Sequence, residues 1–214
     1  MTESGPASTE PEELLAQLSR SVRNPRVLEA IRAVPRPAFV PPELQDRAYE
    51  NVALPIGTGQ TISQPLVVAR MLELLELRGD ELVLDVGTGS GYHAALLARL
   101  SRRVISIERH AELSRRAGEA LAALRVRNVE LVVGDGSRGL PDRGPFDAIN
   151  VAAAGNLDAV RNLSRQLAPG GRLVAPMAEP NRPNAQRLVV AHAGPEGTSA
   201  HWQEAVRFVP LVSD

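Results

Sequence analysis

The chain has 214 residues, a formal net charge of −1, 43% hydrophobic and 23% charged residues. This composition is typical of a globular protein and gives no overall attraction to nucleic acid or to an acidic membrane surface. It has no cysteine, and all 24 basic residues are arginine, which excludes disulfides, thiolate nucleophiles and lysine chemistry. Since we find neither an apolar run of membrane-spanning length nor a signal peptide, we expect a cytoplasmic protein with no membrane or nucleic-acid partner.

The N-terminal part of the chain predicts helices followed by a linker. Residues 1–10 are small and polar, so we expect them to be disordered. Apolar residues recur at helical spacing over residues 11–34, with a break at Asn24 and Pro25, which predict the cap and first turn of a second helix. The proline-rich residues 34–44 predict an extended linker. Residues 63–77 predict an amphipathic helix that ends at Gly79.

The rest of the chain alternates between apolar strands and helices. The predicted strands are residues 81–86, 103–108, 129–135, 146–154 and 172–177, and the predicted helices are residues 91–100, 111–124 and 156–167. This order predicts an α/β fold with a doubly wound, mostly parallel, Rossmann-like sheet. Two further strand-like runs after residue 184, around a Gly/Pro turn, predict a terminal antiparallel pair.

We expect a single domain over residues 11–214. Within it, residues 11–78 hold the N-terminal helices and an active-site loop, residues 79–178 form the cofactor-binding core, and residues 179–214 form the C-terminal antiparallel strands. We find no internal repeat, and we expect a monomer.

A glycine turn with the sequence "VLDVGTGSGYHAALLA" lies between a strand and a helix, as nucleotide-binding turns do. Gly87 and Gly89 allow close approach of a ligand, and Glu108 at the end of the next strand suits ribose recognition. These features alone would also fit NAD. However, the spacing is GxGxG, and Asp85 lies at the strand end, where it would repel a pyrophosphate but favour the cationic ligand S-adenosylmethionine (SAM). Alternatively, Asp85 only caps the turn.

A third polar strand end follows in "VVGDGSRGLP". Asp135 can accept a hydrogen bond from an adenine amine, and Gly136 allows close approach. Asp-Gly is also an ordinary turn dipeptide, but its position after two strands that fit a nucleoside site favours a role in cofactor binding.

An earlier polar loop, "LPIGTGQTISQP" from Leu54 to Pro65, identifies the reaction. The loop is preceded by "RAYENVA". It is followed by the glycine turn, "VISIER", "GDGSRGLPDRGPFDAINVAAA", "LAPGGRLVAPM" and "VRFVPL". With these segments, the chain from Arg26 to Val212 resembles the protein-L-isoaspartate (D-aspartate) O-methyltransferases. The glycine turn and "GD" are shared by methyltransferases generally, whereas the earlier loop is specific to this family.

The resemblance implies a class I SAM-dependent methyltransferase sheet with added N-terminal helices and a terminal antiparallel strand. It implies methyl esterification of L-isoaspartyl and D-aspartyl carboxylates in damaged proteins and peptides, with S-adenosyl-L-homocysteine (SAH) as the product. The active-site serine falls on Ser63. The implied cofactor contacts are Gln60, Thr61, Ile62, Gly87, Gly89, Glu108, Arg109, Asp135 and Gly136. Asn51 departs from the family, since many relatives have an acidic residue there.

The residue types agree with this chemistry. Transfer of a methyl group from a sulfonium to a carboxylate is an in-line displacement, and a carboxylate is already ionised at neutral pH, so no general base is needed. We expect Ser63 to orient the substrate carboxylate by a hydrogen bond, although it could instead cap the following helix. The four histidines have no ligand spacing, so we expect no metal site.

Three other functions remain open on the sequence. A related O-methyltransferase could act on a normal aspartyl carboxylate of one dedicated peptide or on a small acid. A non-catalytic SAM-binding protein is disfavoured by the set of Ser63, Asp85, Glu108 and Asp135. An NAD-dependent oxidoreductase is disfavoured by the GxGxG spacing and by Asp85.

Overall fold

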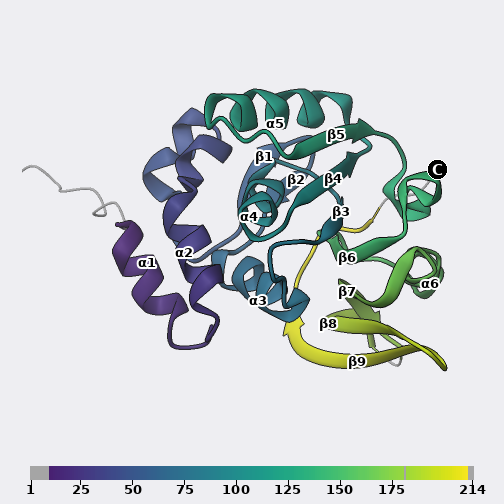
Figure 1. The fold of residues 1–214 in the computed structure, drawn as a ribbon. Coiled ribbons are helices and arrows are strands. Elements are labelled where there is room, and N and C mark those ends of the chain that lie inside the picture. The colour runs from purple at the N-terminus through teal and green to yellow at the C-terminus, as the bar shows by residue number, and fades with distance from the viewer. Residues whose placement is uncertain (1–9, 181, 212–214) are drawn as a thin grey trace, which may run out of the picture.

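A seven-stranded sheet forms the centre of the computed structural model, which describes residues 10–180 and 182–211 (Figure 1). The strand order is β5-β4-β3-β6-β7-β8-β9. The strands are β3 (Leu82–Val86), β4 (Arg103–Glu108), β5 (Val129–Val133), β6 (Phe146–Val151), β7 (Leu167–Glu179), β8 (Arg182–Gly194) and β9 (Gly197–Val206). The first five in this order pair in parallel, whereas β8 is antiparallel to both β7 and β9. The predicted doubly wound sheet with terminal antiparallel pairing is therefore confirmed. The expected disorder of residues 1–10 falls, except for Glu10, outside the described residues.

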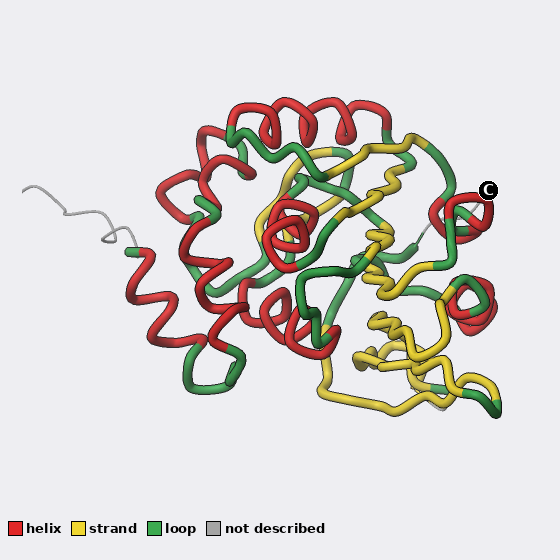
Figure 2. Tube along the Cα trace, viewed as in Figure 1, coloured by secondary structure: helices red, strands yellow, loops and turns green. Residues whose placement is uncertain are grey.

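Helices cover both faces of this sheet (Figures 1 and 2). Their bounds are α1 (Pro11–Leu18), α2 (Pro25–Ala33), α3 (Pro65–Leu75), α4 (Tyr92–Leu100), α5 (Ala111–Ala123) and α6 (Leu157–Ser164). Side chains of α1 to α5 share one hydrophobic cluster, and those of α6 belong to a second cluster that includes Leu84 and Ile105. The two clusters bury the sheet on both sides, as its near-continuous apolar strands require.

The helix ends show where local sequence signals predicted the boundary of a helix correctly and where they did not. Asn24 caps α2, because its side chain accepts a hydrogen bond from the backbone N–H of Arg26 at 3.0 Å, as predicted. The helix α3 ends at Leu75, earlier than predicted, since Glu76 adopts a left-handed conformation with φ of 49°. Similarly, α6 ends at Ser164, and the following Ala-Pro-Gly-Gly segment is part of β7.

Two segments predicted to be irregular have regular structure. The expected extended linker over residues 34–44 is wrong, because this part of the chain enters the 3₁₀ helices η1 (Arg36–Phe39) and η2 (Pro42–Arg47). Short turns tolerate proline in their first positions, and the N–H groups of Ala38 and Leu44 close these turns. The polar loop forms a hairpin of β1 (Leu54–Gly57) and β2 (Gln60–Ile62). Two further 3₁₀ helices, η3 (Gly136–Arg138) and η4 (Pro141–Arg143), follow β5.

Gly91 joins the glycine turn to α4 and is the turn residue least tolerant of a side chain. Its φ is +90°, and a Cβ there would lie 3.0 Å from the Cβ of Ala117 in α5. We expect Gly91→Ala to lower the free energy of unfolding by about 2 kcal/mol or more, from backbone strain and crowding together. Urea unfolding measures this. Gly170→Ala is the matched control, because Gly170 has a φ of +80° but open space around it. Equal losses in the two variants would contradict the crowding argument.

Candidate active site

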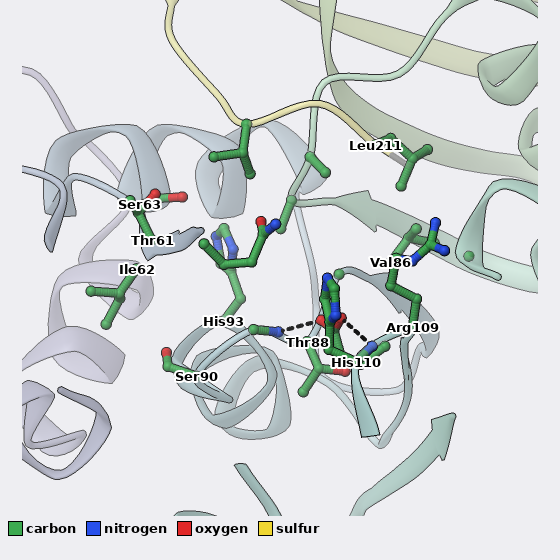
Figure 3. Close-up of a pocket in the computed structure, with 18 of the residues that line it drawn as sticks. Thr61, Ile62, Ser63, Val86, Thr88, Ser90, His93, Arg109, His110 and Leu211 are labelled. Atoms are coloured by element: carbon green, nitrogen blue, oxygen red, sulfur yellow. Dashed lines mark hydrogen bonds between the residues drawn. The ribbon is translucent and has the colours of Figure 1, made fainter. Parts of the chain in front are cut away.

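A pocket that is partly open to solvent lies at the carboxyl ends of β3, β4 and β6. The strand order reverses there, since β4 and β6 flank β3 on opposite sides, and ligands of open α/β sheets bind at such points. The hairpin end at Thr61 and Ser63 forms one wall in Figure 3, while Val86, Arg109 and Leu211 lie across from it. The pocket is therefore built between the sheet and the hairpin that precedes it in sequence.

Glu108 anchors the floor of this pocket. Its carboxylate is nearly buried and accepts two backbone hydrogen bonds at 2.9 Å each, from Gly89 in the glycine turn and from His110 (Figure 3). A carboxylate has about four lone-pair positions, so two remain for donors of a ligand. Glu108 thus fixes the glycine turn and still suits the two hydroxyls of a ribose.

Asp85 lies behind the pocket wall rather than on it. The side chain is fully buried, and it accepts hydrogen bonds from Asn150 and Ser106 at 2.7 Å each. The strand register explains this, because Asp85 is the partner of Ser106 on β4 and of Asn150 on β6. Ser106 in turn shares a hydrogen bond with Thr88, which lines the pocket. Burial raises the pKa of Asp85 to about 6, although the two hydrogen bonds lower it.

Ser63 follows β2 and lines the pocket, and its side chain has no hydrogen-bond partner among the described residues. The alternative that it caps α3 is not what the structure shows. Gln64 is the cap residue of α3 and makes no side-chain capping bond, while Asn51 accepts a hydrogen bond from the N–H of Leu66 at 3.0 Å. The unusual Asn51 therefore serves the helix N-terminus, and the Ser63 hydroxyl remains available to a ligand.

The structure brings most of the predicted site residues together. Those lining the pocket are Gln60, Thr61, Ile62, Ser63, Gly87, Gly89, Glu108, Arg109 and Gly136. Asp85 and Asp135 are not part of the lining. The carboxylate of Asp135 accepts a hydrogen bond from the N–H of Ser137 at 2.9 Å and begins η3, so it places Gly136 against the pocket. Direct contacts of Asp85 and Asp135 with a cofactor stay predictions.

Sequence reasoning missed His93 and the segment 209–211. His93, the second residue of α4, lines the pocket and points toward Thr61 and Ser63 in Figure 3. Burial lowers the pKa of His93 to about 4, so the ring is neutral at physiological pH. Residues 209–211 line the pocket because Val209 and Leu211 exchange backbone hydrogen bonds with Ala154. The motif "VRFVPL" contributed to the family resemblance, but it did not predict that this segment lines the pocket.

The described residues offer neither a metal-binding cluster nor a membrane-spanning helix. They include no group of three or more His, Asp or Glu side chains that could hold a metal ion. None of the helices in the same ranges is both long and apolar enough to cross a membrane.

The donors and acceptors of the pocket fit a nucleoside with a cationic tail. Glu108 suits ribose hydroxyls, apolar Val86 and Ile107 suit a base, and the carboxylate of Asp85 is buried behind the pocket wall. With the strand order, these features define a class I SAM-dependent methyltransferase.

The chain belongs to the protein-L-isoaspartate(D-aspartate) O-methyltransferase family, whose model matches residues 9–214. It is 49% identical over 197 residues to protein-L-isoaspartate O-methyltransferase 1 of Rhodopseudomonas palustris, covering 92% of this chain and 79% of that one. The enzyme of the same name from Syntrophobacter fumaroxidans is 49% identical over 195 residues, covering 91% and 89%. A Plasmodium falciparum protein solved in complex with SAH shares the fold, with a TM-score of 0.82 and 24% identity over 96% of this chain and all of that one.

Proposed function

We propose that this enzyme methylates the free carboxylate of L-isoaspartyl and D-aspartyl residues in damaged proteins and peptides. The family match over residues 9–214 supports the reaction, and SAM is its methyl donor. The observation that carries the assignment to this pocket is the Ser63 hydroxyl, which faces the pocket and has no partner among the described residues.

The protein's own groups need to orient the reactants and exclude water. When bound, SAM supplies a methyl group that is already activated by its sulfonium. A substrate carboxylate is ionised at neutral pH, so no side chain has to remove a proton. Ser63 donates a hydrogen bond that orients this carboxylate, Glu108 holds the ribose, and Ile62, Val86 and Leu211 exclude water from the pocket. Orientation of two reactants can lower a barrier by about 7–11 kcal/mol.

Ser63→Ala is expected to lower kcat for an isoaspartyl peptide by about 10–100-fold, because the carboxylate loses a hydrogen bond that fixes its direction. Binding of SAH should be retained, since Ser63 is assigned to the substrate. Steady-state kinetics with labelled SAM, together with calorimetric titration of SAH, measure both. Thr58→Ala is the control, because Thr58 lies at the exposed tip of the same hairpin. Unchanged turnover in Ser63→Ala would refute the role of this serine.

The second candidate function is a related O-methyltransferase for a normal aspartyl carboxylate of a dedicated peptide or for a small acid. The hydroxyl of Ser63 would orient any of these carboxylates, so the geometry permits it. Incubation with methyl-labelled SAM followed by mild base tests the shared chemistry, because a carboxyl methyl ester releases its label. Retention of the label in base would argue against carboxyl methylation altogether.

We also propose that the enzyme is a cytoplasmic monomer that acts on protein substrates without nucleic acid or a membrane. The absence of cysteine and a net charge of −1 accord with this. Light scattering on the purified protein tests the monomer, and a mass of twice 22.9 kDa would contradict it.

A further inference from the structure

Arg36 is a buried cation that the reaction described above does not use. It is the first residue of η1, its exposed fraction is 0%, and it is among the largest fully buried side chains. No carboxylate of the described residues pairs with it. Burial lowers the pKa of Arg36 to about 10, so the side chain is charged at neutral pH. A buried charge without a counter-charge is costly, and its retention calls for an explanation.

The contacts of this guanidinium lead to the pocket wall. Nη2 donates to the backbone carbonyl of Ser63 at 2.9 Å and to that of Val52 at 3.4 Å. The guanidinium carbon lies 5.1 Å from the centre of the Tyr92 ring. Ser63 and Tyr92 both line the pocket, from the hairpin and from α4. Arg36 therefore joins the two elements whose relative position sets the direction of the Ser63 hydroxyl.

A purely structural role, in which Arg36 only links backbone carbonyls of two segments, does not explain the environment of its guanidinium. Its Nε and Nη1 are buried without a partner among the described residues, whereas a tie between backbone carbonyls needs only one or two donors. Arg26 illustrates such a tie: it donates to the carbonyls of Leu77 and Leu100, at 2.7 and 3.3 Å, from an exposed side chain away from the pocket. At Arg36 the positive charge is enclosed directly behind a wall that, on the proposed function, faces an anionic substrate group.

We propose that Arg36 is a positioning residue for this reaction: it fixes Ser63 through its backbone carbonyl, and its positive charge favours the substrate carboxylate beside the Ser63 hydroxyl. This inference rests on the proposed function. Because no carboxylate of the described residues pairs with Arg36, the substrate carboxylate is the negative charge that the guanidinium attracts. In a poorly hydrated interior, such an attraction acts over longer distances than in water.

The other charged and titratable groups near this position do not provide the same field. On α4, burial raises the pKa of Tyr92 to about 12 and lowers that of His93 to about 4, so both are neutral at physiological pH. Glu108, Arg109 and His110 line the pocket at the end of β4, and Asp85 lies below the glycine turn. Within the described part of the chain, only Arg36 combines a positive charge with a bond to Ser63.

The test compares Arg36→Lys, which keeps the charge, with Arg36→Gln, which is neutral and keeps an N–H donor on a shorter side chain. For Arg36→Gln we expect kcat/KM for an isoaspartyl peptide to fall about 100-fold, mainly through KM, and for Arg36→Lys to fall about tenfold or less. The dissociation constant of SAH should be unchanged in both. Arg26→Gln is the matched control and should leave the kinetics at the wild-type level.

Equal losses for the Lys and Gln variants, or a parallel loss of SAH affinity, would overturn the inference, because both are expected of a purely structural tie. If circular dichroism shows that Arg36→Gln is unfolded, Arg36→Lys carries the test against Arg26→Lys, and a fall in kcat/KM of Arg36→Lys by much more than about tenfold overturns the role of the charge. Failure of the proposed function is distinct: the wild type would then bind SAH without methylating the isoaspartyl peptide.

Discussion

Glu108→Ala is expected to weaken the binding of SAH and SAM by more than about 100-fold. Glu108 has an exposed fraction of 6%, and its carboxylate accepts hydrogen bonds from the N–H groups of Gly89 and His110. Its removal leaves two backbone donors without their acceptor, loosens the glycine turn and removes the acceptor for the ribose hydroxyls. A charged hydrogen bond contributes about 1.5–3 kcal/mol, so we expect a loss of about 3 kcal/mol or more, which is over about 100-fold in affinity.

Calorimetric titration with SAH measures this loss. Glu112→Ala is the control, because Glu112 is an exposed acid in the first turn of α5 that pairs with Arg115. Glu108→Gln keeps the shape and one acceptor oxygen, and we expect it to fall between Glu108→Ala and the wild type. A dissociation constant for Glu108→Ala within about tenfold of the wild type would show that the ribose is not held here.

Asp85→Asn is expected to remove a pH dependence of stability. Burial raises the pKa of Asp85 to about 6 in the folded state, from an ordinary value of 3.8. A raised folded-state pKa means that the protonated form stabilises the fold below pH 3.8, and that this contribution is lost as the pH rises through about 6. The difference between the two pKa values corresponds to about 3 kcal/mol. The asparagine variant does not titrate, so its free energy of unfolding should rise relative to that of the wild type by about 2 kcal/mol between pH 4 and pH 7.

The substitution is structurally conservative. The Oδ1 atom of Asn150 is buried without a partner among the described residues, so rotation of this amide provides an acceptor for the side-chain amide that Asp85→Asn introduces. Urea unfolding of both proteins across this pH range measures the difference, in which the other carboxylates cancel. Asp142→Asn, in the exposed part of η4, is the control and should show no such trend. A pH-independent difference for Asp85→Asn would contradict the buried, titrating carboxylate.

The sheet and the cofactor half of the pocket could be predicted because local signals encode them. Strand periodicity, the glycine turn and Glu108 lie within a short stretch of chain, and parallel strands bring their carboxyl ends to one edge. The hairpin with Gln60 and Ser63 lies outside that stretch and carries no such signal, so it was assigned to the pocket only through the family resemblance.

The rest depends on contacts between segments that are far apart in the sequence. Arg36 reaches Ser63 because η1 folds against α4, and Asn51 reaches the start of α3 across the hairpin. Asp85 was expected on the pocket surface, and the register with Ser106 and Asn150 instead places it in the sheet. The helices η1 and η2 were not predicted from the sequence, because proline occurs both in extended chain and in the first positions of short helical turns.

The central claim is that this pocket methylates the isoaspartyl carboxylate in preference to a normal aspartyl carboxylate. The most direct measurement uses two peptides that differ only in this linkage, with methyl-labelled SAM and release of the label by mild base. We predict base-labile label in the isoaspartyl peptide and none above background in the aspartyl peptide. Equal labelling of the two peptides, or preferential labelling of the aspartyl peptide, would contradict the account.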